Sequence, residues 1–155
     1  MCPLFRLIIM KFHKGRYKVK NPDKYVGNVN KVVYRSSWEL KCMNYFDRNP
    51  NVIQWSSEEL AIPYISPIDK KMHRYFPDFV IQVISQDGSK KTLMIEVKPE
   101  KQTKPPQKRK RTTQRYIQEV KDYGINTAKW EAAQEYCADR KWEFKILTER
   151  EIGKW

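Results

Sequence analysis

The sequence has few cysteines, and their arrangement excludes two classes of small protein. Its three cysteines, Cys2, Cys42 and Cys137, include no Cys-x-x-Cys pair of the kind that zinc sites use. Their odd number also argues against a disulfide framework, so a reducing cytoplasm suits the chain. Cys42 and Cys137 fall in helical apolar patterns, and we interpret them as small core residues.

The sequence also lacks a long apolar run. The apolar opening, residues 1–9, is too short to cross a bilayer, is interrupted by Arg6 and has no small-residue cleavage site. We therefore predict no membrane segment and no signal peptide. A basic stretch opens at Met10, so Met1 and Met10 are alternative translation starts.

Acidic residues are scarce relative to basic ones. The chain has 18 acidic against 31 basic residues and a formal net charge of +13, which favours a polyanionic partner, nucleic acid first. Charge alone is weak evidence, because many small proteins are basic. A chain of 155 residues is long enough to bury one core. We predict a basic N-terminal arm over residues 1–30 and one folded domain over residues 31–155.

The arm itself has two interpretations. Residues 11–30 are basic, contain Pro22 and Gly27, and show no sustained periodicity. They form either an extended arm that follows a phosphate backbone or a solvated tail ordered only by local packing.

Apolar periodicity and turn residues predict an α/β fold. The predicted elements are a helix over 36–47, strands over 51–55 and 58–65, a polar connection over 66–74, a hairpin of 75–84 and 91–98, helices over 113–123 and 127–140, and a strand over 142–147. A helical crossover before the last strand predicts its parallel pairing with the hairpin's second strand. The order is α-β-β-β-α-β, a mixed sheet flanked by helices, and Thr148 and Glu151 offer a capping box for a short terminal helix.

Two carboxylates and a lysine lie in the predicted hairpin. Glu96 and Lys98 are two residues apart in an apolar run, so alternation along the strand sends both side chains to one face. If the hairpin turns around Asp87, Asp78 lies directly opposite Glu96. Facing Cβ atoms are about 4.5–5.5 Å apart, which allows one divalent cation to bridge both carboxylates.

Taken singly, these residues have ordinary explanations: Asp78 can bond a turn, and Lys98 can extend from a strand edge into water. Their combination favours a site, because strand interiors are depleted in Asp, Glu and Lys. Phosphodiester hydrolysis uses an oxygen-ligated Mg²⁺ and a cation that positions water or the phosphate. We therefore predict a hydrolytic metal site, with Mg²⁺ as the expected ion and Mn²⁺ as an alternative.

Glu39 also has two interpretations. It is the third helical residue after Ser36, so it can complete a capping box. It also shares the helical face expected to meet the sheet with Cys42, Met43 and Phe46. A carboxylate on that face needs a partner, and a metal held by the hairpin carboxylates would be one. Both roles can coexist.

The motifs together resemble a known family. Glu39, Pro77-Asp78 and Glu96-Val97-Lys98, in this element order, resemble the PD-(D/E)xK nucleases, which include restriction endonucleases and TnsA-like endonucleases. Further stretches resemble the head-completion nucleases of large contractile-tailed bacteriophages, at residues 34–39, 74–79, 95–99, 126–133 and 146–149. The leader before Met10 departs from that pattern, which favours the later start.

The resemblance implies a restriction-endonuclease-like fold and a metal-dependent DNA endonuclease domain over residues 31–155. It implies that Asp78 and Glu96 ligate the metal, with the Val97 carbonyl as a third oxygen. Lys98 would orient the attacking water, and Glu39 would complete the site. The expected cofactor is the metal, with no small-molecule organic cofactor.

Residues 99–115 form a basic segment that follows the strand of Glu96. Its only acid is Glu100, and Pro105-Pro106 prevents regular structure. Our candidate DNA contacts are its seven basic residues: Lys101, Lys104, Lys108, Arg109, Lys110, Arg111 and Arg115. A solvated basic loop is the alternative.

The resemblance implies an enzyme that processes packaged DNA ends before tail attachment, in the host cytoplasm and the virion head. Its partners would be DNA and phage head or connector proteins. The alternative is a non-catalytic structural head-completion or DNA-binding protein. A transposase or restriction subunit would need a further recognition region, for which the chain has little room.

Overall fold

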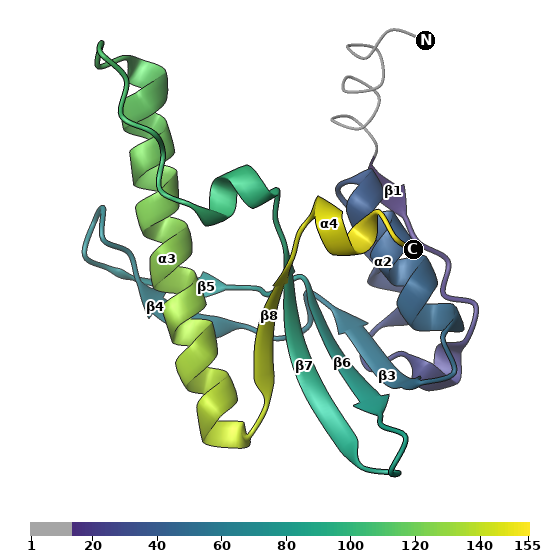
Figure 1. Ribbon diagram of the computed structural model, residues 1–155. Coiled ribbons are helices and arrows are strands. Elements are labelled where there is room, and N and C mark those ends of the chain that lie inside the picture. Colours follow the sequence, from purple (N-terminus) through teal and green to yellow (C-terminus); the bar gives the residue numbers. More distant parts are fainter. Residues whose placement is uncertain (1–13) are drawn as a thin grey trace, which may run out of the picture.

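The computed structural model describes residues 14–155, so the leader and both candidate start residues lie outside the described residues. Figure 1 shows a central sheet with the long helix α3 on one side and helices α2 and α4 on the other. Within residues 14–155, no helix is both long enough and apolar enough to cross a membrane.

The described residues form three helices, three 3-10 turns and eight strands. The helices are α2 (Ser37–Arg48), α3 (Gln114–Arg140) and α4 (Glu149–Ile152), with single 3-10 turns η1 (Pro22–Lys24), η2 (Val29–Lys31) and η3 (Glu100–Thr103). The strands are β1 (Gly15–Arg16), β2 (Val33–Tyr34), β3 (Val52–Ser57), β4 (Ile62–Ile65), β5 (Met72–Tyr75), β6 (Phe79–Ile84), β7 (Lys90–Val97) and β8 (Glu143–Leu147).

The central sheet has the strand order β3-β6-β7-β8. Strand β6 runs antiparallel to β3 and β7, whereas β7 and β8 are parallel and are connected through α3. The order α2-β3-β6-β7-α3-β8 confirms the predicted α/β fold with a mixed, helix-flanked sheet. The predicted capping box of Thr148 and Glu151 is also present at the start of α4.

The register of the β6–β7 hairpin is the predicted one. Phe79 pairs with Ile95, so the next pair outward is Asp78 with Glu96. The turn contains Gly88 at φ 84°, a backbone conformation that glycine adopts without steric cost. The turn and the apolar alternation of both strands therefore agree on one alignment.

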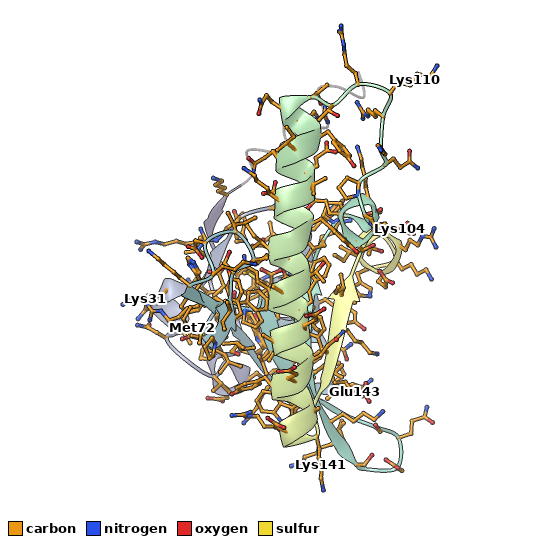
Figure 2. All side chains as sticks on the ribbon, turned by 90° about the vertical axis from the view of Figure 1, so that its left-hand side faces the viewer. Lys31, Met72, Lys104, Lys110, Lys141 and Glu143 are labelled. Atoms are coloured by element: carbon orange, nitrogen blue, oxygen red, sulfur yellow. The ribbon has the colours of Figure 1, made fainter. Side chains whose placement is uncertain are left out.

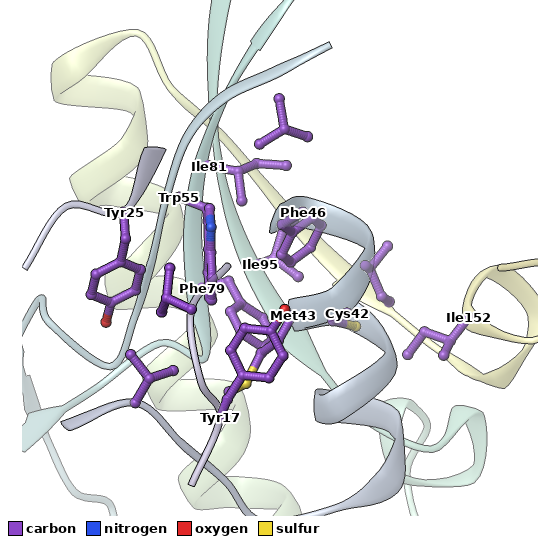
Figure 3. Packing of buried hydrophobic residues seen from close by; sticks show 14 residues of the cluster. Tyr17, Tyr25, Cys42, Met43, Phe46, Trp55, Phe79, Ile81, Ile95 and Ile152 are labelled. Carbon is purple, nitrogen blue, oxygen red and sulfur yellow. The ribbon is translucent and has the colours of Figure 1, made fainter. Parts of the chain in front are cut away.

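Two buried clusters cover the two faces of the sheet. The first joins α2, α4 and the segment before α2 to the sheet; Figure 3 shows it, with Tyr17, Tyr25, Cys42, Met43, Phe46, Trp55, Phe79, Ile81, Ile95 and Ile152 labelled. The second joins α3 and the β4–β5 hairpin to the opposite face, through Ile62, Tyr64, Tyr75, Met94, Ala133 and Cys137. Cys42 and Cys137 are both buried, as predicted. The sheet is therefore covered on both faces.

Residues 14–30, part of the segment assigned to a basic arm, contribute to the first cluster. Tyr17, Val19 and Tyr25 are buried there, and the hydroxyl of Tyr17 donates to Asp47 Oδ2 at 3.0 Å. Local packing therefore orders this segment against α2 and β3. The boundary after residue 30 stays a prediction.

Helix α3 corrects one expectation. We predicted separate helices over 113–123 and 127–140, but one helix runs unbroken from Gln114 to Arg140 with Gly124 inside it. A single internal glycine costs only about 1 kcal/mol of helix stability relative to alanine. Burial of Trp130, Ala133 and Cys137 along the second half outweighs that cost.

The β4–β5 hairpin differs from a second expectation. The predicted polar connection over 66–74 contains most of β5, which pairs with β4 as a separate two-stranded sheet. The strand predicted over 58–65 is therefore outside the central sheet. Met72, His73 and Arg74 are all exposed, so β5 lacks the apolar alternation that marks a half-buried strand.

Candidate active site

Glu96 and Lys98 lie beside each other at the carboxyl end of β7, as alternation predicted. Lys98 Nζ is 3.7 Å from Glu96 Oε1, and Glu96 is only 6% exposed. Strands β6 and β8 flank β7, and the Lys98 amide donates to the Leu147 carbonyl at 3.0 Å. Pairing on both sides therefore fixes the backbone that carries the acid and the lysine.

Asp78 lies just before β6, across from Glu96. Its Oδ2 accepts a hydrogen bond from the Val97 amide at 2.7 Å, which connects the carboxylate to β7. Burial, followed by the negative charge of Glu96, raises the pKa of Asp78 well above its usual range. Burial also raises the pKa of Glu96, although Tyr75 and Lys98 oppose that rise. The negative charges of the two carboxylates therefore repel each other where little water is available to screen them.

Two further residues, Tyr75 and Lys129, contact or face this pair and were not predicted. The hydroxyl of Tyr75, a residue only 4% exposed, donates to Glu96 Oε2. Lys129 Nζ on α3 lies 5.7 Å from the centroid of the Tyr75 ring, and its charge favours ionised Glu96. Both residues lie in stretches that resemble the head-completion nucleases, 74–79 and 126–133, but it is the packing of α3 on the β4–β5 hairpin that brings them to Glu96.

Glu39 lies in the first turn of α2. Its amide donates to Ser36 Oγ at 3.1 Å, so Ser36 caps the helix, but its carboxylate Oε2 accepts from the Arg35 amide at 2.8 Å. The reciprocal half of the predicted capping box is therefore absent from α2. Burial raises the pKa of Glu39, and the charge of Glu96 adds to the rise. Across residues 14–155, no hydrogen bond or ion pair joins Glu39 to either hairpin carboxylate.

The donor set suits a hard divalent cation. Carboxylate oxygens are the ligands that Mg²⁺ and Mn²⁺ prefer, and Asp78 and Glu96 supply two carboxylates at one place. Within the part of the chain that the structure describes, no three acidic, histidine or cysteine side chains are gathered as a metal-binding group. The structure thus brings together two of the three predicted carboxylates, with Glu39 turned to Arg35.

The predicted basic residues lie in η3, in the exposed segment after it and in the first turn of α3. A cleft of about 530 Å³ separates that segment from the first half of α3, and four of the seven predicted residues line it: Lys101, Lys104, Arg109 and Arg115. Two of these form ion pairs: Lys104 Nζ lies 3.6 Å from Glu100 Oε1, and Arg115 Nε lies 3.2 Å from Glu119 Oε1. Ion pairs on an exposed surface contribute little binding energy.

Residues 49–149 match the family of TnsA-like endonuclease N-terminal domains. The chain belongs to this family. It is also 38% identical over 141 residues to the head completion nuclease of Enterobacteria phage T4, an alignment that covers 88% of this chain and 91% of that protein. The predicted family is therefore confirmed. The TnsA-like match spans Asp78, Glu96, Lys98 and Lys129, whereas Glu39 precedes it.

Membership of the TnsA-like endonucleases makes the protein a nuclease. DNA is therefore its substrate, and a domain of this family implies a divalent metal cofactor. These statements agree with the hard oxygen ligands at the end of β7 and with the net charge of +13.

Proposed function

We propose that this protein is a Mg²⁺-dependent DNA endonuclease that processes packaged DNA ends during phage head completion, before tail attachment. The observation that carries the proposal is the Asp78–Glu96 pair with Lys98 Nζ 3.7 Å from Glu96 Oε1, in a TnsA-like domain. The similarity to the head completion nuclease of phage T4 supports the biological setting.

In this proposal Asp78 and Glu96 hold the metal, with the Val97 carbonyl and Glu39 completing its ligands. When bound, the cation would supply positive charge that stabilises charge developing on the phosphate. The Arg35 amide donates to Oε2 of Glu39, so Oε1 is the oxygen that Glu39 would offer to the metal.

The remaining side chains orient the reacting groups. Lys98 positions the attacking water or the scissile phosphate, because its ammonium lies at the exposed edge of the carboxylate pair. Tyr75 holds Glu96 by its hydroxyl, which leaves Oε1 directed toward Lys98. Lys129 balances the charge of Glu96 from α3. Each group is held by a paired strand or a long helix, which favours a fixed geometry.

The seven basic residues of the segment after β7 bind the DNA backbone in this proposal. The segment begins at Pro99, directly after Lys98, so its charges lie at the approach to the site. Phage head or connector proteins are the proposed protein partners, and the host cytoplasm and the virion head are the proposed places of action.

Cleavage assays with labelled linear, circular and branched DNA test the proposal most directly. Wild-type protein should cut at least one of these substrates with Mg²⁺ or Mn²⁺ and none in EDTA, and Lys98→Ala should abolish cutting. Lys145→Ala, at an exposed lysine of β8, removes the same charge and serves as the matched control. Inactivity of the wild type on every substrate would favour the non-catalytic structural role instead.

A separate experiment tests the basic segment. Replacing Lys108, Arg109 and Lys110 with glutamine should reduce the salt dependence of DNA binding, because log affinity changes by about 0.9 per phosphate contact per log unit of salt. Fluorescence anisotropy in EDTA measures this slope without cleavage. An unchanged slope would remove these residues from the interface.

A further inference from the structure

The outer face of the β4–β5 hairpin is apolar although it is exposed. In the β4–β5 register, Pro63 pairs with Arg74 and Ile65 with Met72, and alternation places these four side chains on one face. Ile65 is 59% exposed and Met72 is 65% exposed. The opposite face, with Ile62, Tyr64 and Tyr75, is buried in the cluster beneath α3. The hairpin therefore presents an unpartnered apolar face to solvent.

This outer face continues toward the candidate active site. Phe76 follows β5 directly, is 44% exposed and lies two residues before Asp78. The guanidinium carbon of Arg74 is 5.9 Å from the centroid of the Phe76 ring. Phe76 therefore extends this face along the chain toward Asp78.

The charge of the hairpin favours a polyanion as that molecule. Lys70, Lys71 and Arg74 are exposed, and the acid at the tip, Asp69, is paired with His73 at 2.7 Å. A second copy of the chain docked on the same face would bring these positive charges together. DNA phosphates would instead neutralise these positive charges, and DNA is the substrate of the nuclease.

We propose that the outer face of the β4–β5 hairpin is a second DNA-contacting surface, which places Ile65, Met72 and Phe76 against unstacked bases beside the scissile phosphate. Arg74 and the two tip lysines contact the adjacent backbone. Apolar side chains between basic ones are the means by which proteins unstack and kink DNA. The proposal rests on the proposed endonuclease function and adds a substrate class, DNA with unpaired or easily unstacked bases at the cleavage point.

This surface is separate from the basic segment after β7. Figure 2, in which α3 lies in front of the sheet, shows Met72 on one side of α3 and Lys104 and Lys110 on the other. DNA contacting both surfaces would therefore be held from two sides of α3. The two surfaces can be disabled independently.

The test uses the full chain and a DNA duplex with 2-aminopurine beside a short unpaired tail. In EDTA, where no metal supports cleavage, wild-type protein should raise the fluorescence of 2-aminopurine as the base unstacks. The Met72→Ser/Phe76→Ser double variant should bind about tenfold more weakly and lose that fluorescence rise. Ile84→Ser changes another exposed apolar residue, at the far end of β6, and should behave as wild type.

A second variant tests the contribution of the positive charge of Arg74. Arg74→Gln should lower the slope of log affinity against log salt by about one phosphate contact. Because both measurements are made without cleavage, they remain informative if the nuclease assay fails. Unchanged affinity, fluorescence and salt slope in these variants would overturn the proposal. So would a wild-type dimer in sedimentation that Met72→Ser/Phe76→Ser separates while DNA binding stays the same, since the occupant would then be a second copy.

Discussion

Two aspartates, Asp47 and Asp78, lie in very different surroundings. Asp47, at the end of α2, is fully buried and accepts hydrogen bonds on both oxygens. Its Oδ2 receives the Tyr17 hydroxyl at 3.0 Å and the Lys20 amide at 2.7 Å, and its Oδ1 receives the Asn21 amide at 3.2 Å. These donors replace the lost hydration, so Asp47 fixes the segment before α2 onto the domain.

Asp78 receives one amide hydrogen bond, from Val97, and faces a second carboxylate. Its surroundings therefore raise its pKa, because they penalise the charged form more than they stabilise it. Burial of an acidic side chain is therefore not sufficient to identify it as functional. A structural carboxylate is surrounded by donors, whereas a catalytic one retains unmet charge that a metal or substrate can use.

Replacing Asp78 should have the largest effect on cleavage. Asp78→Asn keeps the shape of the side chain but removes the charge that the metal needs, so cleavage should fall by about 10³-fold or more. DNA binding in EDTA should persist. Single-turnover cleavage and anisotropy measure the two quantities, and cleavage at the wild-type rate would remove Asp78 from the site.

Asp47→Asn should show the opposite behaviour. An amide presents its NH₂ group to some of the three donors, so the free energy of unfolding should decrease by about 2–3 kcal/mol. Cleavage per folded molecule should stay the same. Urea unfolding and active-site titration report these values, and a loss of activity without a loss of stability would contradict the structural role.

Tyr75→Phe should weaken the site without removing a ligand. The hydroxyl that holds Glu96 is lost, so metal affinity and cleavage should fall by about 10–100-fold. Isothermal titration with Mn²⁺ measures the affinity directly. The control is Tyr64→Phe: this ring is 5.8 Å from Lys129 Nζ, but within residues 14–155 its hydroxyl bonds no site carboxylate. Equal losses in both variants would assign the effect to packing.

The pH dependence of stability should report the raised pKa of Asp78. The raised pKa of Asp78 means that the folded protein binds its proton more tightly than the unfolded chain does. This stabilisation is complete below the unfolded pKa, near about 4, and is lost as pH rises through the higher folded pKa. The loss is about 1.4 kcal/mol for each pH unit that separates the two pKa values.

The metal-free wild type should therefore lose stability over this range relative to Asp78→Asn, which cannot ionise. Thermal unfolding in EDTA between pH 4 and pH 8 gives the comparison. A difference between the two proteins that stays constant with pH would show that Asp78 keeps an ordinary pKa.

Glu39→Gln should have the smallest effect, with a reduction in cleavage of about tenfold. Glutamine can still accept the Arg35 amide, and the Ser36 cap uses only the backbone of residue 39, so α2 should remain as stable. Circular dichroism on heating checks the helix. Full activity would leave Glu39 with its structural contact alone.

Local sequence patterns were sufficient to predict one part of this protein, the hairpin that carries the site. Alternation and a single turn set the β6–β7 register, because a shift by one residue would move each side chain of a strand to the opposite face of the sheet. The same pattern placed Glu96 beside Lys98 and Asp78 across from them. The long crossover required β7 and β8 to be parallel.

Contacts between distant segments, in contrast, were settled only by the way the elements pack. The donors of Asp47 come from residues more than twenty positions earlier, and Tyr75 and Lys129 reach Glu96 from a separate hairpin and from α3. The unbroken course of α3 past Gly124 and the pairing of β5 also depend on packing. Such contacts leave no local periodicity in the chain, because each is stabilised by surfaces that meet only after folding.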